Sequence, residues 1–223
     1  MKRTSPLVFF TLALMFFFFS CAALPGGPSA EHQRDEQADA EVNPFLISLP
    51  ERPSIPAVPR YIMGRGLVPP EKLAAFLLDA NPGADRAFVG ELAIMYVEES
   101  AIEGVNHDVA FAQMSLETGF LRFGNLVTPD QNNFAGLGAT GPGFPGLRFP
   151  DARTGVRAQI QHLKAYASEA PLNQELVNPR FFLVRRGSSP GISGLAGTWA
   201  EDPLYAEKIT AILERLYFFS FAN

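Results

Sequence analysis

Cysteine, histidine and basic residues are scarce in this 223-residue chain, and each scarcity removes a class of function. The single cysteine, Cys21, excludes an intramolecular disulfide. The three histidines (His32, His107 and His162) have no metal-ligand spacing, so we expect neither a metal site nor a cofactor. Lys and Arg number 18 against 23 Asp and Glu, which gives a net charge of −5. Such an acidic chain lacks the basic face that nucleic-acid binding requires, and we expect no nucleic-acid partner.

Residues 1–20 have the pattern of a secretory signal peptide. Two basic residues precede an apolar run over residues 7–19, which is shorter than the ~20 residues that a membrane-spanning helix needs. Cys21 follows the small Ser20, at the position where bacterial lipoproteins carry their lipid, although Phe18 replaces the usual leucine. The sequence therefore predicts an exported lipoprotein that is anchored through Cys21 to a membrane of the cell envelope. An ordinary signal peptide with an incidental cysteine is the alternative.

Residues 21–58 are predicted to be a lipidated N-terminus and a linker. They are first polar, acidic and small, and then rich in proline. Such a composition buries too little apolar surface to fold, and the prolines make a semi-extended spacer. We therefore place the folded domain at residues 59–223.

The spacing of apolar residues predicts that this domain is mostly α-helical. Helices are expected over residues 70–80, 86–103, from 107 onward, 154–167 and 202–218. Gly104 is expected to end the second helix and Asn106 to cap the third. Residues 119–150 contain seven glycines and four prolines, which predict a long loop or a small β-lobe. Several phenylalanines and leucines in this segment can pack, which argues against disorder.

Glu117 is the strongest candidate for a chemical role. The helix that begins at His107 is apolar nearly all round after Asp108, as is typical of a buried helix. Glu117 lies in its last turn, where burial and the negative end of the helix dipole both favour the protonated acid. A carboxylic acid that is protonated near neutral pH can donate a proton to the leaving oxygen of a glycoside. A solvated helix end is the alternative.

Four ordered segments of the sequence resemble a single family. They are AQMSLETG (112–119), NNFAGLG (132–138), GVRAQIQHL (155–163) and TWAEDPLYAEKI (198–209). Together they resemble the bacterial peptidoglycan N-acetylglucosaminidases, the endo-β-N-acetylglucosaminidase-like autolysins of the lysozyme-like superfamily. The resemblance extends from about residue 88 to the C-terminus, and four motifs in order are far more specific than one.

This resemblance implies a mostly α, lysozyme-like fold, in which a helical core and a small Gly/Pro-rich lobe form a cleft. It implies that Glu117 is the general acid and that Tyr205 lies near the cleft, although Tyr205 could equally be a packing residue. The candidates for substrate binding are Gln113, Asn132, Asn133 and Phe134. The two asparagines could instead shape a turn, and Phe134 and Trp199 could serve the core.

The second catalytic group is less evident. Glycosidases with two carboxylates set a base or nucleophile opposite the acid, and some relatives place a second glutamate in the lobe. This chain has no glutamate between Glu117 and Glu169. Asp151, taken here as a catalytic candidate, or Asp130 could position water, but both could be turn or helix-start residues. The 2-acetamido group of the substrate could otherwise act as nucleophile.

The sequence thus predicts a glycoside hydrolase that cuts β-1,4 bonds of peptidoglycan on the reducing side of N-acetylglucosamine, without a cofactor. Its expected partners are the glycan strand and, through Cys21, a membrane. A lytic transglycosylase or a muramidase of similar fold is one alternative. A non-catalytic, wall-binding lipoprotein is the other.

Overall fold

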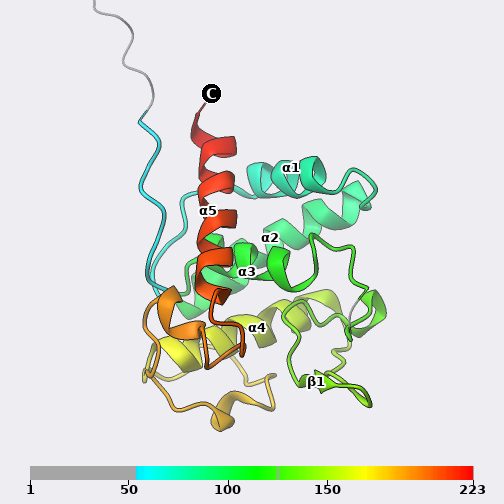
Figure 1. The fold of residues 1–223 in the computed structure, drawn as a ribbon, viewed down its shortest axis with the longest axis vertical. Coiled ribbons are helices and arrows are strands. Elements are labelled where there is room, and N and C mark those ends of the chain that lie inside the picture. Colours follow the sequence, from blue (N-terminus) through cyan, green and yellow to red (C-terminus); the bar gives the residue numbers. More distant parts are fainter. Residues whose placement is uncertain (1–53, 125, 223) are drawn as a thin grey trace, which may run out of the picture. The chain divides into compact units, whose positions relative to one another are not determined.

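The computed structural model describes residues 54–124 and 126–222, and this part of the chain is mostly helical, as predicted (Figure 1). Its α-helices are α1 (Pro70–Ala80), α2 (Arg86–Glu103), α3 (His107–Glu117), α4 (Ala152–Ala167) and α5 (Tyr205–Phe221). Short 3-10 helices are η1 (Pro129–Gln131), η2 (Phe181–Leu183) and η3 (Ile192–Leu195). The predicted signal peptide and Cys21 lie outside the described residues. None of the helices just named combines the length and apolarity that a membrane span requires.

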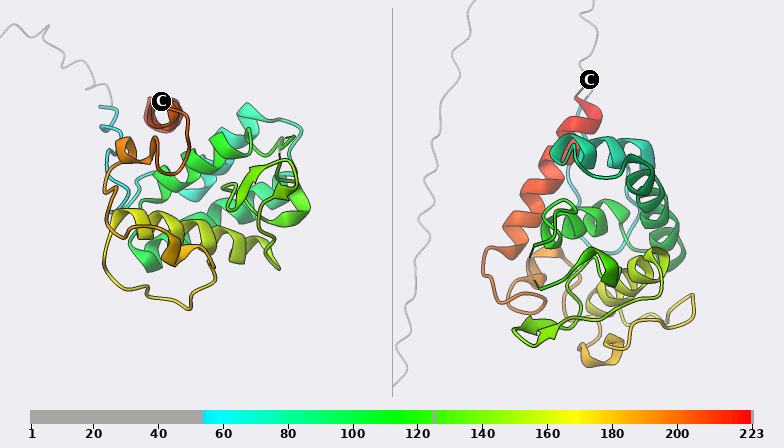
Figure 2. Two further views of the ribbon diagram at one scale, coloured as in Figure 1. Left: turned by 60° about the horizontal axis from the view of Figure 1, so that its bottom comes forward. Right: turned by 90° about the vertical axis from the view of Figure 1, so that its right-hand side faces the viewer.

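Helix α3 is the buried centre of the domain. Its residues from His107 to Ser115 are all buried, and it contacts α2, α4 and α5. Figure 2 shows α3, in green, enclosed by the other helices. The predicted cap is confirmed, because the Asn106 side chain accepts hydrogen bonds from the backbone N–H groups of Asp108 and Val109. The apolar character of α3 therefore places its last residue, Glu117, at the edge of the core.

A buried carboxylate ties the start of α3 to two other parts of the chain. Asp108 is fully buried and accepts hydrogen bonds from the backbone N–H groups of Leu67 at 2.7 Å and Val68 at 3.2 Å. The Tyr217 hydroxyl, on α5, donates to the same carboxylate at 2.8 Å. A buried charge is tolerated only when it is hydrogen-bonded in this way. Asp108 thus fixes both the segment before α1 and the helix α5 against α3.

Ion pairs between α2 and α4 hold these two helices together. Lys164 Nζ lies 2.8 Å from Glu103 Oε2, and both side chains are buried. Arg157 Nε lies 2.8 Å from Glu99 Oε2, which is also buried. Removing one partner of such a pair leaves an uncompensated buried charge, which is strongly destabilising. The relative position of α2 and α4 is therefore narrowly defined.

The glycine- and proline-rich segment folds into the predicted small lobe. Its strands β1 (Ala139–Gly141) and β2 (Phe144–Pro145) form a two-stranded antiparallel sheet. Two side-chain amides brace it: the Asn133 amide donates to the carbonyls of Leu137 and Leu147, both at 3.0 Å, and its oxygen accepts from Leu137 N at 2.9 Å, while the Gln131 amide donates to the Pro145 carbonyl at 3.0 Å. Side-chain amides thus provide hydrogen-bond partners for backbone groups that the short strands leave unpaired.

Three helix boundaries differ from those predicted, one of which is the end of α5 at Phe221, three residues beyond the predicted end. Helix α4 begins two residues early, at Ala152, because the Asp151 side chain accepts from Thr154 N and caps it. Helix α5 begins at Tyr205, three residues later than expected, because Asp202 Oδ1 accepts from Leu204 N at 2.9 Å and closes a turn there.

The lobe rests on the first turn of α4 at Gly155. A Cβ atom at this position would lie 1.7 Å from the carbonyl oxygen of Asn132, whereas one at Gly90, inside α2, would meet no atom within 4 Å. We expect Gly155→Ala to lower the free energy of unfolding by about 1–3 kcal/mol through overpacking. The control Gly90→Ala should raise it by roughly 0.5–1 kcal/mol, because alanine favours helix. Urea unfolding measures the free energy of unfolding of both variants. Equal changes in the two would show that the lobe does not approach α4 closely at Gly155.

Candidate active site

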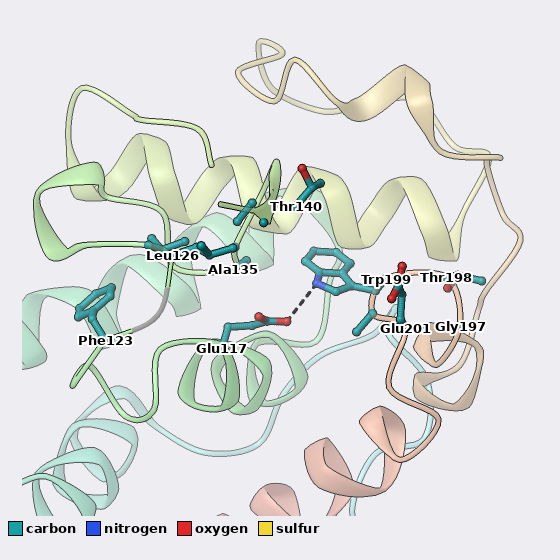
Figure 3. Close-up of a pocket in the computed structure, with 14 residues that line it drawn as sticks. Glu117, Phe123, Leu126, Ala135, Thr140, Gly197, Thr198, Trp199 and Glu201 are labelled. Atoms are coloured by element: carbon teal, nitrogen blue, oxygen red, sulfur yellow. Dashed lines mark hydrogen bonds between the residues drawn. The ribbon is translucent and has the colours of Figure 1, made fainter. Parts of the chain in front are cut away.

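Glu117 points into a cavity of about 670 Å³ (Figure 3). The lining residues come from three segments: the end of α3 with the loop that follows it, the lobe, and residues 197–201. The cavity therefore lies between the helical core and the lobe, where the cleft was predicted.

Two hydrogen-bond donors converge on one oxygen of the Glu117 carboxyl group. Trp199 Nε1 donates to Oε1 at 3.2 Å, and the Tyr205 hydroxyl donates to the same oxygen. The other oxygen, Oε2, faces the lobe at Gly136, where an added Cβ would lie 3.4 Å away, at van der Waals contact. Gly136 also has a φ of +63°, a conformation that favours glycine. The two oxygens thus have different surroundings.

Burial raises the pKa of Glu117 above its ordinary value, because the charged form loses hydration. The hydrogen bonds from Tyr205 and Trp199 act in the opposite direction, since they favour the carboxylate, but they offset the effect of burial only in part. Glu117 is therefore not a solvated helix end. It is a carboxyl group that retains its proton to a higher pH than an exposed glutamate.

A row of hydrogen bonds behind Tyr205 fixes the direction of its hydroxyl. Gln113 Nε2 donates to the Tyr205 oxygen at 3.0 Å, and Gln159 Nε2 donates to Gln113 Oε1 at 2.9 Å. The Tyr96 hydroxyl in turn donates to Gln159 Oε1 at 2.5 Å. Because the Tyr205 oxygen already accepts from Gln113, its own hydrogen is directed at Glu117. Burial and the nearby Glu117 raise the pKa of Tyr205 well above its usual value, so it stays a neutral donor.

Trp199 is held in the cavity wall by two other aromatic rings. Its ring centroid lies 4.9 Å from that of His162, edge to face, and 5.7 Å from that of Tyr166. Burial, with a smaller effect of Arg180, lowers the pKa of His162 to about 4, so this imidazole is neutral at neutral pH. A neutral ring packs against Trp199 without a charge to solvate. Trp199, which the sequence alone left to the core, therefore lines the cavity and donates to Glu117.

The predicted substrate-binding residues have structural partners. Gln113 is buried and bonded to Tyr205, and Asn133 is buried within the lobe. Asn132 donates to the Phe149 carbonyl at 3.1 Å, and Phe134 is 1% exposed. Within the described chain, none of these four candidates lines the cavity. These four side chains lie behind the residues that line the cavity and help to hold those residues in place.

The two candidate aspartates are also engaged away from the cavity. Asp151 caps α4 and accepts from the Thr154 backbone and hydroxyl. Asp130 is exposed and lies 2.7 Å from Arg148 Nη2. Neither belongs to the described lining of the cavity, and this part of the chain holds no cluster of three or more His, Cys, Asp or Glu side chains arranged for a metal ion.

Sequence reasoning did not identify Tyr96, Gln159 or Glu201. Tyr96 and Gln159 complete the hydrogen-bond row, and Glu201 lines the cavity. Gln159 offered a signal, because it is a polar residue among the buried positions of α4, next to Ala158 and Ile160. Tyr96 offered none, because a tyrosine on an apolar helix face is ordinary core.

The hydrogen bond from Tyr205 predicts a measurable effect on Glu117. Removing a donor to the carboxylate disfavours the charged form, so we expect Tyr205→Phe to raise the pKa of Glu117 further. The control is Tyr166→Phe, since that hydroxyl donates to the Thr198 carbonyl at 2.9 Å and not to Glu117. NMR titration of the Glu117 side-chain carbon measures the pKa in each protein. An unchanged pKa in Tyr205→Phe would show that the bond does not form in solution.

Comparison with known proteins agrees with this geometry. A family model described as glucosaminidase, mannosyl-glycoprotein endo-β-N-acetylglucosaminidase, matches residues 93–218, a range that includes Glu117, Trp199 and Tyr205. An uncharacterized protein of Borreliella burgdorferi (strain ATCC 35210) is 45% identical over 163 residues, which cover 73% of this chain and 80% of that protein. The chain therefore belongs to the glucosaminidase family, as a glycoside hydrolase that acts on peptidoglycan.

Proposed function

We propose that this protein hydrolyses the β-1,4 bond on the reducing side of N-acetylglucosamine in peptidoglycan glycan strands, with Glu117 as the general acid. The observation that carries the proposal is the largely buried carboxyl group with a raised pKa, set in a cavity between core and lobe. A protonated acid at this place can transfer its proton to the glycosidic oxygen as the bond to the sugar breaks.

The surroundings of Glu117 suit both halves of this proton transfer. Because Oε1 accepts two hydrogen bonds, the acidic proton resides on Oε2, the oxygen that faces the lobe. Burial favours the neutral acid before transfer. After transfer, the donors Trp199 and Tyr205 stabilise the carboxylate that remains. The neutral Tyr205 contributes a hydrogen bond and no charge in either state.

The identity of the bond is tested by the products. Purified sacculi are digested, and the new reducing ends are identified by mass spectrometry. Reducing N-acetylglucosamine is the expected end. Reducing N-acetylmuramic acid would instead assign a muramidase, and 1,6-anhydro-muramic ends would assign a lytic transglycosylase.

The role of Glu117 is tested by Glu117→Gln, which keeps the shape of the side chain and removes the acid. We expect the rate of sacculus hydrolysis to fall by at least ~10²-fold, the usual scale for general acid catalysis. Asp151→Asn and Asp130→Asn, whose side chains are bonded elsewhere, should each cost far less. If Glu117→Gln retained its specific activity, Glu117 would not be the general acid. If neither wild type nor variant cuts sacculi but both sediment with them, the protein binds the wall without hydrolysing it.

Stability separates a catalytic Glu117 from a structural one. Since burial raises the pKa of Glu117, the folded protein binds more protons than the unfolded chain between the ordinary and the raised pKa. Glu117 therefore contributes a decrease in the free energy of unfolding as pH rises through this window, whereas His162, whose pKa is lowered to about 4, contributes an increase in both proteins. The difference in the free energy of unfolding, wild type minus Glu117→Gln, should therefore fall as pH rises, and at neutral pH the variant should be at least as stable as wild type. Denaturant unfolding at several pH values provides the comparison.

We also propose, on the pattern of residues 1–21 alone, that the mature chain begins at Cys21 and is attached to a membrane through a lipid on its thiol. Radiolabelled palmitate should enter the wild-type protein and not Cys21→Ser. Wild type without label, together with a membrane-bound Cys21→Ser, would exclude this attachment.

A further inference from the structure

Proton donation by Glu117 is only half of a hydrolysis, because a water molecule must also attack the sugar carbon. In the single-displacement route a second carboxylate orients this water and accepts its proton. Asp130 forms an ion pair with Arg148, and Asp151 accepts hydrogen bonds from Thr154, so both carboxylates are engaged away from the cavity. The lobe residues that line the cavity carry no carboxylate in the described chain.

A second carboxylate lies elsewhere in the same cavity, on Glu201. Among the described lining residues, only Glu117 and Glu201 are acidic. Figure 3 shows Glu201 on the segment that carries Trp199, across the indole from Glu117. Glu201 is exposed to solvent, and within the described part of the chain its carboxylate forms no hydrogen bond or ion pair. It is therefore free to bind water or substrate.

The backbone that carries Glu201 is fixed on both sides. Before it, Trp199 N donates to the Leu195 carbonyl at 2.9 Å, and Gly197 N donates to the Ala200 carbonyl at 2.8 Å. After it, Asp202 closes the turn that begins α5. Because Trp199 and Tyr205 both donate to Glu117, Glu201 lies on a short segment that is tied to the acid at each end.

We propose that Glu201 is the general base of the reaction, a role that rests on the proposed hydrolysis. Its carboxylate holds a water molecule and accepts one proton from it as the water oxygen bonds to the anomeric carbon. The bond from that carbon to the glycosidic oxygen breaks, and Glu117 gives its proton to this oxygen. One water is consumed, both new ends carry hydroxyl groups, and solvent returns the proton from Glu201 to Glu117. The displacement inverts the anomeric centre.

The different environments of the two carboxyl groups suit these two roles. Glu117 is largely buried and retains its proton to a higher pH than an exposed glutamate, whereas Glu201 is exposed to solvent. Acid–base catalysis uses pairs of carboxyl groups in such unlike surroundings.

The test compares Glu201→Gln with Glu207→Gln, an exposed acid on α5 that is not among the residues lining this cavity. Both proteins act on soluble peptidoglycan fragments, and circular dichroism melting checks that each is folded. We expect Glu201→Gln to lose at least ~10²-fold in kcat with little change in KM, and Glu207→Gln to lose nothing. Sodium azide, a nucleophile that needs no base, should restore turnover of Glu201→Gln and yield an α-glycosyl azide.

Other outcomes overturn the proposal in distinguishable ways. If Glu201→Gln is as active as wild type while Glu117→Gln is inactive, the proposed function stands and Glu201 is not the base; the substrate's acetamido group then becomes the nucleophile. A loss that azide does not reverse, in a folded variant, would also exclude the base role. If wild-type protein produces no new reducing ends, the proposed function fails, and the role of Glu201 fails with it.

Discussion

The hydrogen bond from Tyr205 to Glu117 is the interaction on which the arrangement of the site depends, and four helices set its direction. Tyr96 lies on α2, Gln159 on α4, Gln113 on α3 and Tyr205 on α5. Each donates to the next, so the row crosses the core before it reaches the acid. A polar row in an apolar interior is stable because each side chain in it is hydrogen-bonded. The packing of α2, α3, α4 and α5 is thereby coupled to the orientation of one hydroxyl hydrogen.

The lobe shows why glycine is frequent beside the acid. Gly136, beside Glu117 Oε2, has a φ of +63°, which favours glycine, and an added Cβ at Gly146 would lie 3.0 Å from the Asn133 amide. At Gly155 the lobe approaches α4 more closely still, because an added Cβ would lie 1.7 Å from the Asn132 carbonyl oxygen. A segment with almost no regular strand thus has a defined shape. Its glycines permit close approach of the backbone, and its asparagine side chains form hydrogen bonds to the backbone groups that are brought near.

The helices, and the place of Glu117 at the end of a buried helix, could be predicted from the sequence because their signals are local. Asn106, Gly104 and the apolar run of α3 act within a few residues of one another. The partners of Glu117 are 82 and 88 residues away, so only a resemblance to other proteins pointed to Tyr205, and Trp199 was left to the core. Asn132 and Asn133 were taken as candidate sugar ligands, because a sequence does not show whether an amide faces a cavity or a carbonyl of its own lobe.

Trp199 has a consequence for observing the protein. It is the only tryptophan in the chain, and its indole touches the acid, the cavity and the neutral His162. The intrinsic fluorescence excited at the red edge of the absorption band therefore arises from this one ring. Ionisation of Glu117 places a negative charge beside the indole N–H, and a molecule that fills the cavity changes the solvent exposure of the indole. Emission wavelength and quenching by iodide thus report on the cavity wall without a label.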